Sequence, residues 1–289
     1  MIRIGILGSD NSHVESFSKC FNIKGPDQIK GARVVALFGL EKKRTLEAAE
    51  GGNIPTIVKR PQDMIGMVDA VIVVFRHGNL HYKYAAPFIQ AGIPTFIDKP
   101  MTCSVPQAKK LIALARRRKT PITSFSAVRY SPLIEELKKN MKTVGKIRAG
   151  VFCARGSSRS PYGGLFFYGI HSVEMMLEIF GNAVHSVRTT EHNGCAVVTI
   201  AYKKGFAVTF NILDKSRVPF LGGVFGSKGN IFPDKELFAG YLPAMKRFLN
   251  MVKTGKPPIP YKDMLLSVRI LDAMEKSMAK DGKEIVIKQ

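Results

Sequence analysis

Short apolar, β-branched segments alternate with helical patterns over the first 121 residues, and this alternation restricts the possible folds. The expected strands are Ile2–Leu7, Arg33–Phe38, Val68–Phe75 and Thr95–Ile97. The expected helices cover residues 12–21, 42–50 and 82–91, and a fourth begins near Pro106. Strands that alternate with helices are typical of a parallel sheet covered on both faces. We therefore expect an α/β, Rossmann-like dinucleotide-binding domain over residues 1–121.

The remaining residues, 122–289, have a different pattern. Strand-like runs at 147–154, 184–190, 196–202 and 207–212 follow one another, and a Lys204-Gly205 turn separates the last two. Two late helices, at 238–253 and 263–279, are separated by a segment that contains Pro257 and Pro258. This order predicts an α+β domain with a mostly antiparallel, open-faced sheet and helices on one face. The alternative for its C-terminal helix is that it packs against the first domain.

The composition excludes several classes of protein. With 45% apolar residues, a chain of 289 residues is long enough for two packed domains. No apolar run approaches the roughly 20 residues that cross a bilayer, and the N-terminus enters a strand pattern directly, so we expect neither a membrane span nor a signal peptide. The 4 cysteines are scattered without a Cys-x-x-Cys pair, which indicates no disulfide framework, no metal site and a cytoplasmic location.

The formal net charge of +22 favours anionic ligands. Nucleotides, phosphorylated or carboxylated small molecules and nucleic acids all match this charge. The densest basic run, residues 116–119, ends an expected helix, where the helix dipole favours cations. The chain has no zinc-finger spacing and no aromatic RNA-binding segment, so we do not expect specific nucleic-acid binding.

A lysine follows the last expected strand of the first domain, in the sequence Phe96-Ile97-Asp98-Lys99-Pro100. The carboxyl ends of the strands in an open α/β sheet form the ligand crevice. An ammonium group that is partly desolvated there can have its pKa lowered enough to exchange a proton with a substrate hydroxyl or carbonyl. Lys99 is therefore the first catalytic candidate, and the alternative is an ordinary solvent-facing lysine.

The loop after the first strand departs from the Gly-x-Gly-x-x-Gly pattern of dinucleotide-binding folds. Its six residues are Gly8, Ser9, Asp10, Asn11, Ser12 and His13, so only the first glycine is present. We expect residues 8–12 to bind cofactor, with the hydroxyl and amide side chains donating to phosphate at a helix N-terminus. The alternative for Ser12 is a helix cap, because Ser12 and Glu15 have capping-box spacing.

Gly39 ends the second strand, where such folds usually carry an acid that binds the adenosine ribose. Without that acid, and with Lys42 and Arg44 close behind, the sequence favours NADP over NAD as the cofactor. A solvated basic helix turn is the alternative, and Glu41 is a possible substitute for the acid. Arg76 and His77 add positive charge in the loop after the third strand, where they are candidates to bind a cofactor phosphate or an acidic substrate group.

Asp98-Lys99-Pro100 resembles the Glu-Lys-Pro signature of the Gfo/Idh/MocA oxidoreductases, and the resemblance extends from Ile2 to the C-terminus. It implies that Asp98 and Lys99 lie near the nicotinamide, and Lys99 also near the substrate. It further implies that the exposed face of the second-domain sheet forms a subunit contact in a homo-oligomer.

A second segment, Gly163–Glu174, resembles the glycine-rich turn and substrate-site helix of the same family. His171 matches the family histidine, which implies a role in holding a substrate oxygen and moving its proton. The family pattern has an aspartate one helical turn earlier, and this chain has Phe167 there. Tyr162 and Tyr168 are candidate replacement donors in the substrate site. Arg129 matches the arginine of the family Arg-x-x-Pro segment, which makes it a candidate to bind substrate or to reach the cofactor. The alternatives are a buried structural histidine and an arginine that only pins the domain junction.

These observations favour an NAD(P)-dependent oxidoreductase that transfers a hydride to or from a hydroxyl or carbonyl carbon. The expected substrate is a sugar-like or acidic polar small molecule. We expect Lys99 and His171 to meet in one cavity beside the nucleotide. The rival hypothesis is a non-catalytic relative that binds a nucleotide or metabolite as a sensor or scaffold, because the loop glycines and the acid at position 167 are missing.

Overall fold

The computed structural model describes residues 1–25 and 28–288. Contacts divide the chain into two compact units. Unit 1 comprises residues 1–125 and 241–264, and unit 2 comprises residues 126–240 and the segment from Leu265 onward. The observed break after Phe125 lies close to the expected one after Pro121. The segment 241–264, which the sequence pattern assigns to the second domain, groups with unit 1.

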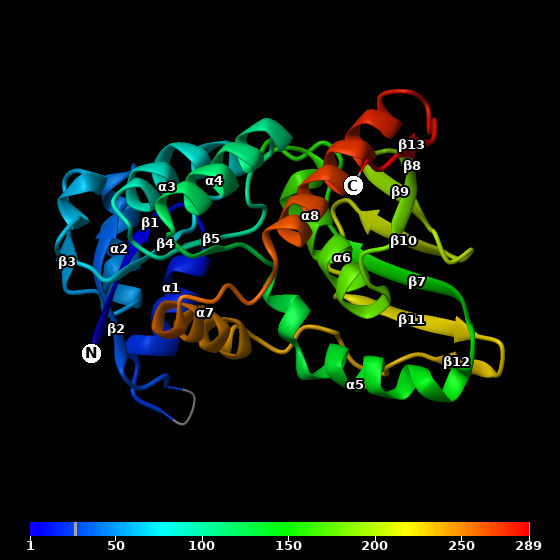
Figure 1. Ribbon diagram of the computed structural model, residues 1–289, viewed down its shortest axis with the longest axis horizontal. Coiled ribbons are helices and arrows are strands. Elements are labelled where there is room, and N and C mark those ends of the chain that lie inside the picture. Colours follow the sequence, from blue (N-terminus) through cyan, green and yellow to red (C-terminus); the bar gives the residue numbers. More distant parts are fainter. Residues whose placement is uncertain (26–27, 289) are drawn as a thin grey trace. The chain divides into compact units, whose positions relative to one another are not determined.

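The predicted parallel sheet of unit 1 is confirmed, and it has six strands in the order β3-β2-β1-β4-β5-β6, of which β3 and β6 were not expected. The strands are β1 (Ile2–Leu7), β2 (Ala32–Phe38), β3 (Thr56–Ile57), β4 (Ala70–Val73), β5 (Thr95–Ile97) and β6 (Ile122–Thr123). The helices between them are α1 (His13–Asn22), α2 (Lys42–Gly51), α3 (His81–Gln90) and α4 (Val105–Arg118). In Figure 1, α3 and α4 cover one face of this sheet and α1 lies on the other. Because both faces are covered, all four residues of β4 are buried.

The late helix α7 (Leu242–Thr254) completes the core of unit 1. Its apolar stripe includes Phe248, whose ring centroid lies 5.8 Å from that of Phe96 on β5. The helix ends at Gly255, which has a left-handed φ of 71° that a glycine adopts without strain. α8 (Tyr261–Met278) begins in unit 1, where the Tyr261 hydroxyl accepts the N–H of Ile122, and it continues into unit 2.

Unit 2 contains a seven-stranded sheet in the order β12-β11-β7-β10-β9-β8-β13. Its strands are β7 (Ile147–Arg155), β8 (Val184–His192), β9 (Cys195–Tyr202), β10 (Ala207–Leu213), β11 (Leu221–Gly226), β12 (Gly229–Ile231) and β13 (Ile285–Val286). The predicted mostly antiparallel sheet is confirmed, with one parallel pair, β7 with β10. The last three strands were not expected from the sequence. β11 is rich in glycine because a Cβ at Gly222 would lie 2.0 Å from the Phe152 ring of the neighbouring strand.

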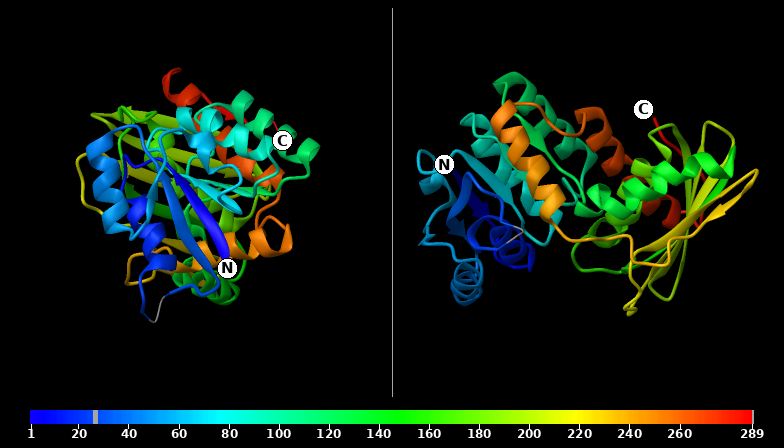
Figure 2. Two further views of the ribbon diagram at one scale, coloured as in Figure 1. Left: turned by 90° about the vertical axis from the view of Figure 1, so that its left-hand side faces the viewer. Right: turned by 90° about the horizontal axis from the view of Figure 1, so that it is seen from below.

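One face of this sheet carries helices and the other does not, within the described residues (Figure 2). Helix α6 (Leu165–Phe180) packs on β7 and β10, and α5 (Pro132–Asn140), which the sequence analysis did not predict, packs on α6. The other face exposes apolar side chains, namely Val151, Val197, Leu221 and Phe225. No helix in the described part of the chain is both long and apolar enough to cross a membrane.

Candidate functional site

The carboxyl ends of β1 and β4 lie side by side in unit 1, where the strand order changes direction. Ligands of doubly wound sheets bind at such a point. Gly8 follows β1 there with a φ of +116°, and a Cβ on it would lie 2.7 Å from the backbone nitrogen of Phe75. Only glycine fits this backbone, so Gly8 allows the two strand ends to approach each other.

Polar side chains of the loop after β1 bridge to the loop after β4. Both oxygens of the Asp10 carboxylate lie 3.1 Å from the backbone nitrogen of Arg76, which donates to them. Asn11 Nδ2 donates to the carbonyl of Val74. These two bonds fix the shape of the crevice and place a carboxylate in it.

The predicted cap by Ser12 is wrong, because Ser12 is exposed and its side chain makes no capping bond. Asn11 Oδ1 instead accepts the N–H of His13 at 2.7 Å. Glu15, the expected second half of the capping box, forms an ion pair with Arg44 at 2.6 Å.

The place of the missing ribose-binding acid is filled by two hydroxyl groups. Ser9 Oγ and Thr45 Oγ1 lie 2.9 Å apart in the core, and Thr45 Oγ1 donates to the carbonyl of Glu41. A Cβ on Gly39 would lie 2.1 Å from both oxygens. A side chain at position 39 would therefore have to displace these hydroxyl groups. The Ser9 hydroxyl, which the sequence analysis assigned to phosphate, is bonded to Thr45.

The charged residues that follow Gly39 are partly committed to structure. The Glu41 carboxylate caps α2 by accepting the N–H groups of Lys43 and Arg44, and these bonds lower the pKa of Glu41. Arg44 is paired with Glu15 and donates to the carbonyl of Asn11. Lys42 is exposed on the first turn of α2 and has no ion-pair partner among the described residues.

His13 and Asp98 form a partly buried pair at the end of β5. Their Nδ1 and Oδ2 atoms are 2.6 Å apart, and the two side chains are only 14% and 4% exposed. Burial acts to raise the pKa of Asp98, but the imidazole of His13 and the ammonium of Lys99 outweigh it and lower that pKa. The His13 ring packs on Phe17 and Tyr241. The residue that replaces the third glycine of the loop is therefore the partner of the acid that precedes Lys99.

Lys99 is the second residue after β5, and its pKa is lowered by burial. The positive charge of Arg76 lowers the pKa further, while Asp98 acts in the opposite direction. His81 fixes this segment, because its two ring nitrogens lie 2.7 Å from the carbonyl oxygens of Pro100 and Phe75. A lysine with a lowered pKa at a strand end is suited to proton transfer.

A capped 3-10 helix and a small cavity also lie in this unit. His77 Nδ1 accepts the N–H of Asn79 at 3.2 Å and so caps a short 3-10 helix, Gly78–Leu80. A cavity of about 220 Å³ lies beside the end of β2, and its lining includes Phe38 and Tyr84. Flat aromatic walls of this kind suit a planar ring.

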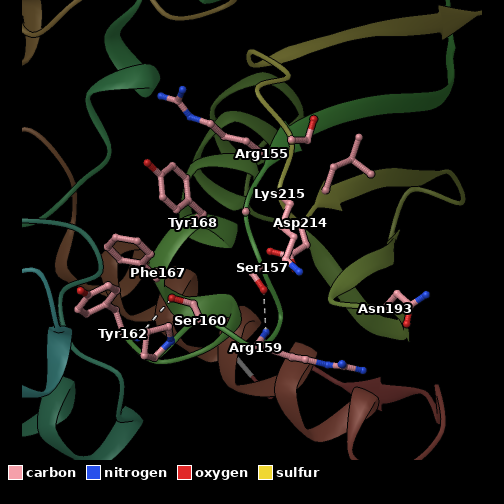
Figure 3. Close-up of a pocket in the computed structure, with 14 residues that line it drawn as sticks. Arg155, Ser157, Arg159, Ser160, Tyr162, Phe167, Tyr168, Asn193, Asp214 and Lys215 are labelled. Carbon is pink, nitrogen blue, oxygen red and sulfur yellow. Dashed lines mark hydrogen bonds between the residues drawn. The ribbon is translucent and has the colours of Figure 1, made fainter.

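Unit 2 contains a larger cavity, of about 800 Å³, between the start of α6 and the ends of β7 and β10 (Figure 3). Its aromatic wall is formed by three side chains that point to the same side, Tyr162, Phe167 and Tyr168. The Phe167 ring centroid lies 5.0 Å from that of Tyr162 and 4.9 Å from that of Tyr168. The charged lining residues are Arg155, Arg159, Asp214 and Lys215. Cations therefore outnumber acids around this cavity.

A carboxylate holds the first turn of α6. The N–H of Leu165 donates to Glu275 Oε1 at 2.7 Å, and burial raises the pKa of Glu275. A Cβ on Gly164 would lie 2.5 Å from the same oxygen. The glycine-rich turn before α6 is thus needed for the carboxylate to reach the helix N-terminus.

His171 is one turn further along α6. Its Nδ1 lies 2.7 Å from the hydroxyl of Ser126, and its ring packs between Tyr168 and Phe220. Ser126 was not identified in the sequence. The only available signal was its position shortly after a strand end, which many serines share.

Arg129 is 7% exposed and lies among carboxylates. Its guanidinium donates to Glu174 and, at 2.7 Å, to Glu178, and Ser267 donates to the other oxygen of Glu174. Burial acts to lower the pKa of Arg129, but the two carboxylates outweigh it and raise that pKa. This arrangement matches the structural alternative for Arg129 better than substrate binding.

The structure thus groups the predicted residues in two places. Gly8, Asp10, Asn11, Arg76, Asp98 and Lys99 gather at the strand ends of unit 1. Tyr162, Tyr168 and His171 gather at the start of α6 in unit 2. The meeting of Lys99 with His171 remains a prediction. Among the described residues, no group of three or more His, Cys, Asp and Glu side chains is placed to hold a metal ion.

Comparison with known proteins identifies a family of oxidoreductases to which the chain is similar. Residues 2–125 match the model of the GFO_IDH_MocA oxidoreductase family, described as having an NAD-binding Rossmann fold. Myo-inositol 2-dehydrogenase of Thermotoga maritima is 25% identical over 89% of this chain and 90% of its own length. The uncharacterized oxidoreductase YhhX of Escherichia coli is 27% identical over 40% of this chain, and the match covers 36% of that protein.

Solved structures of the same fold cover the whole chain. Myo-inositol dehydrogenase from Lactobacillus casei, in complex with NAD(H) and myo-inositol, superimposes with a TM-score of 0.85 at 17% identity. The match covers 100% of this chain and 97% of that one. At this level of identity the superposition establishes the fold shared by the two chains.

Proposed function

Because this chain belongs to the Gfo/Idh/MocA oxidoreductase family, we propose that it is an NAD(P)-dependent oxidoreductase acting on a hydroxyl or carbonyl carbon. The observation that carries this proposal is Lys99, a lysine with a lowered pKa at the end of a parallel strand, next to the paired carboxylate of Asp98. The cofactor, when bound, supplies the hydride acceptor or donor. The protein residues supply the proton transfer and the binding contacts.

In the oxidation direction, the neutral amine of Lys99 accepts the proton of the substrate hydroxyl as the carbonyl forms. In the reduction direction, the ammonium returns a proton to the carbonyl oxygen. Asp98 keeps a negative charge beside the lysine, and the His13 imidazole holds that carboxylate in place. His171 anchors the substrate oxygen in unit 2.

The residues at the switch point of the unit 1 sheet fit a dinucleotide. Gly8 permits a close backbone approach at the N-terminus of α1, where phosphates bind, and Arg76 adds positive charge next to Asp10, which accepts its backbone N–H. The aromatic cavity beside β2 suits the adenine ring. We propose NADP over NAD, because Gly39 cannot carry an acid and Lys42 is exposed close by.

The substrate we propose is a polyol or sugar-like compound, with a preference for one that carries an acidic group. Similarity to inositol dehydrogenases supports the polyol. The excess of cations around the unit 2 cavity supports the acidic group. The open apolar face of the unit 2 sheet supports a homo-oligomer formed through that face. We also keep the cytoplasm as the proposed location.

A second candidate function follows from the loop after β1. Asp10 and Asn11 bridge the crevice with their own side chains, which is compatible with a relative that has lost hydride chemistry and acts as a sensor or scaffold. Such a protein would bind a nucleotide or metabolite without turnover.

The test is direct titration of the purified chain with NADH and NADPH. We expect nicotinamide fluorescence to change and the melting temperature to rise, with NADPH acting at lower concentration than NADH. A panel of polyols and sugar acids with oxidised cofactor then tests for turnover. If neither cofactor binds at millimolar concentration, the oxidoreductase proposal fails. If a cofactor binds but no compound of the panel turns over while a metabolite alone shifts the melting temperature, the second candidate is favoured.

A further inference from the structure

A buried serine limits which ring nitrogen of His171 can carry hydrogen. Ser126 Oγ lies 2.7 Å from His171 Nδ1 and accepts the backbone N–H of Val128 at 3.3 Å. Ser126 is fully buried, so water cannot be its partner. Within the described part of the chain, this hydroxyl has no other hydrogen-bond partner.

The hydrogen of this hydroxyl needs an acceptor. Val128 N–H is itself a donor, so the acceptor left to Ser126 is His171 Nδ1. If Nδ1 carried hydrogen, Ser126 would accept two bonds and its own hydrogen would be buried without a partner, which is unfavourable. The bond therefore runs from Ser126 to Nδ1.

A neutral imidazole that accepts at Nδ1 carries its hydrogen on Nε2. We propose that Ser126 holds His171 in the Nε2–H form, so that His171 donates a hydrogen bond to the substrate oxygen and does not act as a base. This inference rests on the proposed function and gives His171 and Lys99 separate roles in it. Lys99 alone exchanges the proton.

In the oxidation step, only one protein group, the amine of Lys99, then gains a proton. The O–H bond of the substrate breaks and its proton passes to the neutral Nζ of Lys99. The C–H bond breaks and its electron pair leaves as hydride to the oxidised nicotinamide cofactor, while the C=O bond forms. The Nε2–H bond of His171 neither forms nor breaks, and it stabilises charge on the oxygen.

Two aromatic rings pack against His171. Its ring centroid lies 5.4 Å from that of Tyr168 and 5.0 Å from that of Phe220. Glu174 and Glu178 on the same helix, α6, are paired with Arg129 in the 3-10 helix Ala127–Tyr130. A carboxylate partner would only accept hydrogen and would favour the opposite tautomer. Phe167 has no such group.

The tautomer can be measured without substrate or cofactor. Two-bond hydrogen–nitrogen correlation spectra of protein labelled with 15N-histidine distinguish the two forms, and the signals that vanish in His171→Gln identify this residue. We expect a protonated Nε2 and an unprotonated Nδ1. We expect a mixture of tautomers in Ser126→Ala and the original form in Ser126→Thr.

A matched control is available in the same segment. Ser131 is also buried, and its hydroxyl has no hydrogen-bond partner in the described structure. Ser131→Ala should leave the His171 signals unchanged. A protonated Nδ1 in the unmodified protein, or an unchanged tautomer in Ser126→Ala, would overturn the inference even if the protein is an active oxidoreductase.

Kinetics test the role of the donor. Gln at position 171 retains an N–H group, so His171→Gln should keep kcat within about tenfold, whereas His171→Leu should lose about 100-fold or more. Equal losses in the two variants would show that His171 is a base and would refute the division of roles. Absence of any cofactor binding in the unmodified protein would refute the proposed function and would leave the measured tautomer as it stands.

Discussion

The polar residues that replace the glycines after β1 have partners in unit 1, whereas the residue that replaces an acid on α6 of unit 2 has lost its polarity. Asp10 accepts from the amide of Arg76, and His13 pairs with Asp98. Phe167 packs between two tyrosines at the edge of a cavity. In the loop after β1, the charged side chains are present and each has a hydrogen-bond or ion-pair partner. On α6, a phenylalanine stands where the family pattern has a charged aspartate. The two regions therefore depart from the family pattern in different ways, and proton transfer is best assigned to the first.

The largest effect should come from removing the amine of Lys99. We expect Lys99→Ala to lower kcat by about 10²–10⁴-fold, because a positioned acid or base contributes on that scale. Cofactor affinity, measured by fluorescence titration, should change little. Lys109, which is exposed on α4, offers the matched control Lys109→Ala, with activity unchanged. If Lys99→Ala keeps its turnover, the assignment of proton transfer to Lys99 in unit 1 is wrong.

The largest loss of stability should come from the buried ion pair of unit 2. Arg129→Ala leaves Glu174 buried without its cation and should lower the free energy of unfolding by about 3–5 kcal/mol. Lys138 pairs with Glu178 at the surface, and Lys138→Ala should cost less than about 1 kcal/mol. Urea denaturation of the two variants measures the difference. Equal and small losses would mean that Arg129 is available for a ligand, as the sequence suggested.

A smaller loss is expected at Gly39. Gly39→Ala places a Cβ against the hydroxyls of Ser9 and Thr45 and should cost about 1–3 kcal/mol through overpacking. Gly25→Ala is the control, because a Cβ there meets no atom of the described residues within 4 Å. Thermal unfolding of both variants is sufficient. If Gly39→Ala is as stable as the unmodified protein, the hydroxyl groups of Ser9 and Thr45 can move aside at little cost in free energy. That result would weaken the argument for NADP.

The pH dependence of kcat/KM tests whether Lys99, in unit 1, is the group that exchanges the proton with the substrate. The pKa of Lys99 is lowered from the ordinary value of 10.5 by burial, and oxidation requires the neutral amine. In the oxidation direction, kcat/KM should therefore rise with pH through a midpoint below 10.5, and in the reduction direction it should fall through the same midpoint. Arg76→Ala removes a cation that lowers this pKa, so the midpoint should move up. A midpoint that does not respond to Arg76→Ala would point to another group.

Much of unit 1 could be predicted from the sequence, since four of its strands are apolar runs next to a helical pattern, whereas the two-residue strands β3 and β6 were missed. The place of Lys99 near a strand end could be predicted, because it follows such a run in the sequence. The partners of these residues could not be found. His13 and Asp98 are far apart in the chain, and nothing local indicates that they meet.

Unit 2 was harder to predict, because its signals depend on long-range packing. The strand β11 reads as a glycine-rich loop until its neighbour Phe152 is known to fill the space above it. Segment 241–264 has the pattern of an ordinary amphipathic helix, and the pattern does not say which core it completes. Ser126 has no distinctive pattern at all, although it determines the surroundings of His171.

The hydroxyl pair of Ser9 and Thr45 also has a consequence for how a lineage carrying this loop can change. An acid that arises at position 39 by one mutation has to displace this hydroxyl pair, because the space for its first carbon is already occupied. Smaller residues at 9 or 45 would make that space first, but those changes give up a buried hydrogen bond before any gain is available. The order of substitutions is thus constrained by epistasis, because each route to an acid at position 39 passes through a less stable intermediate sequence.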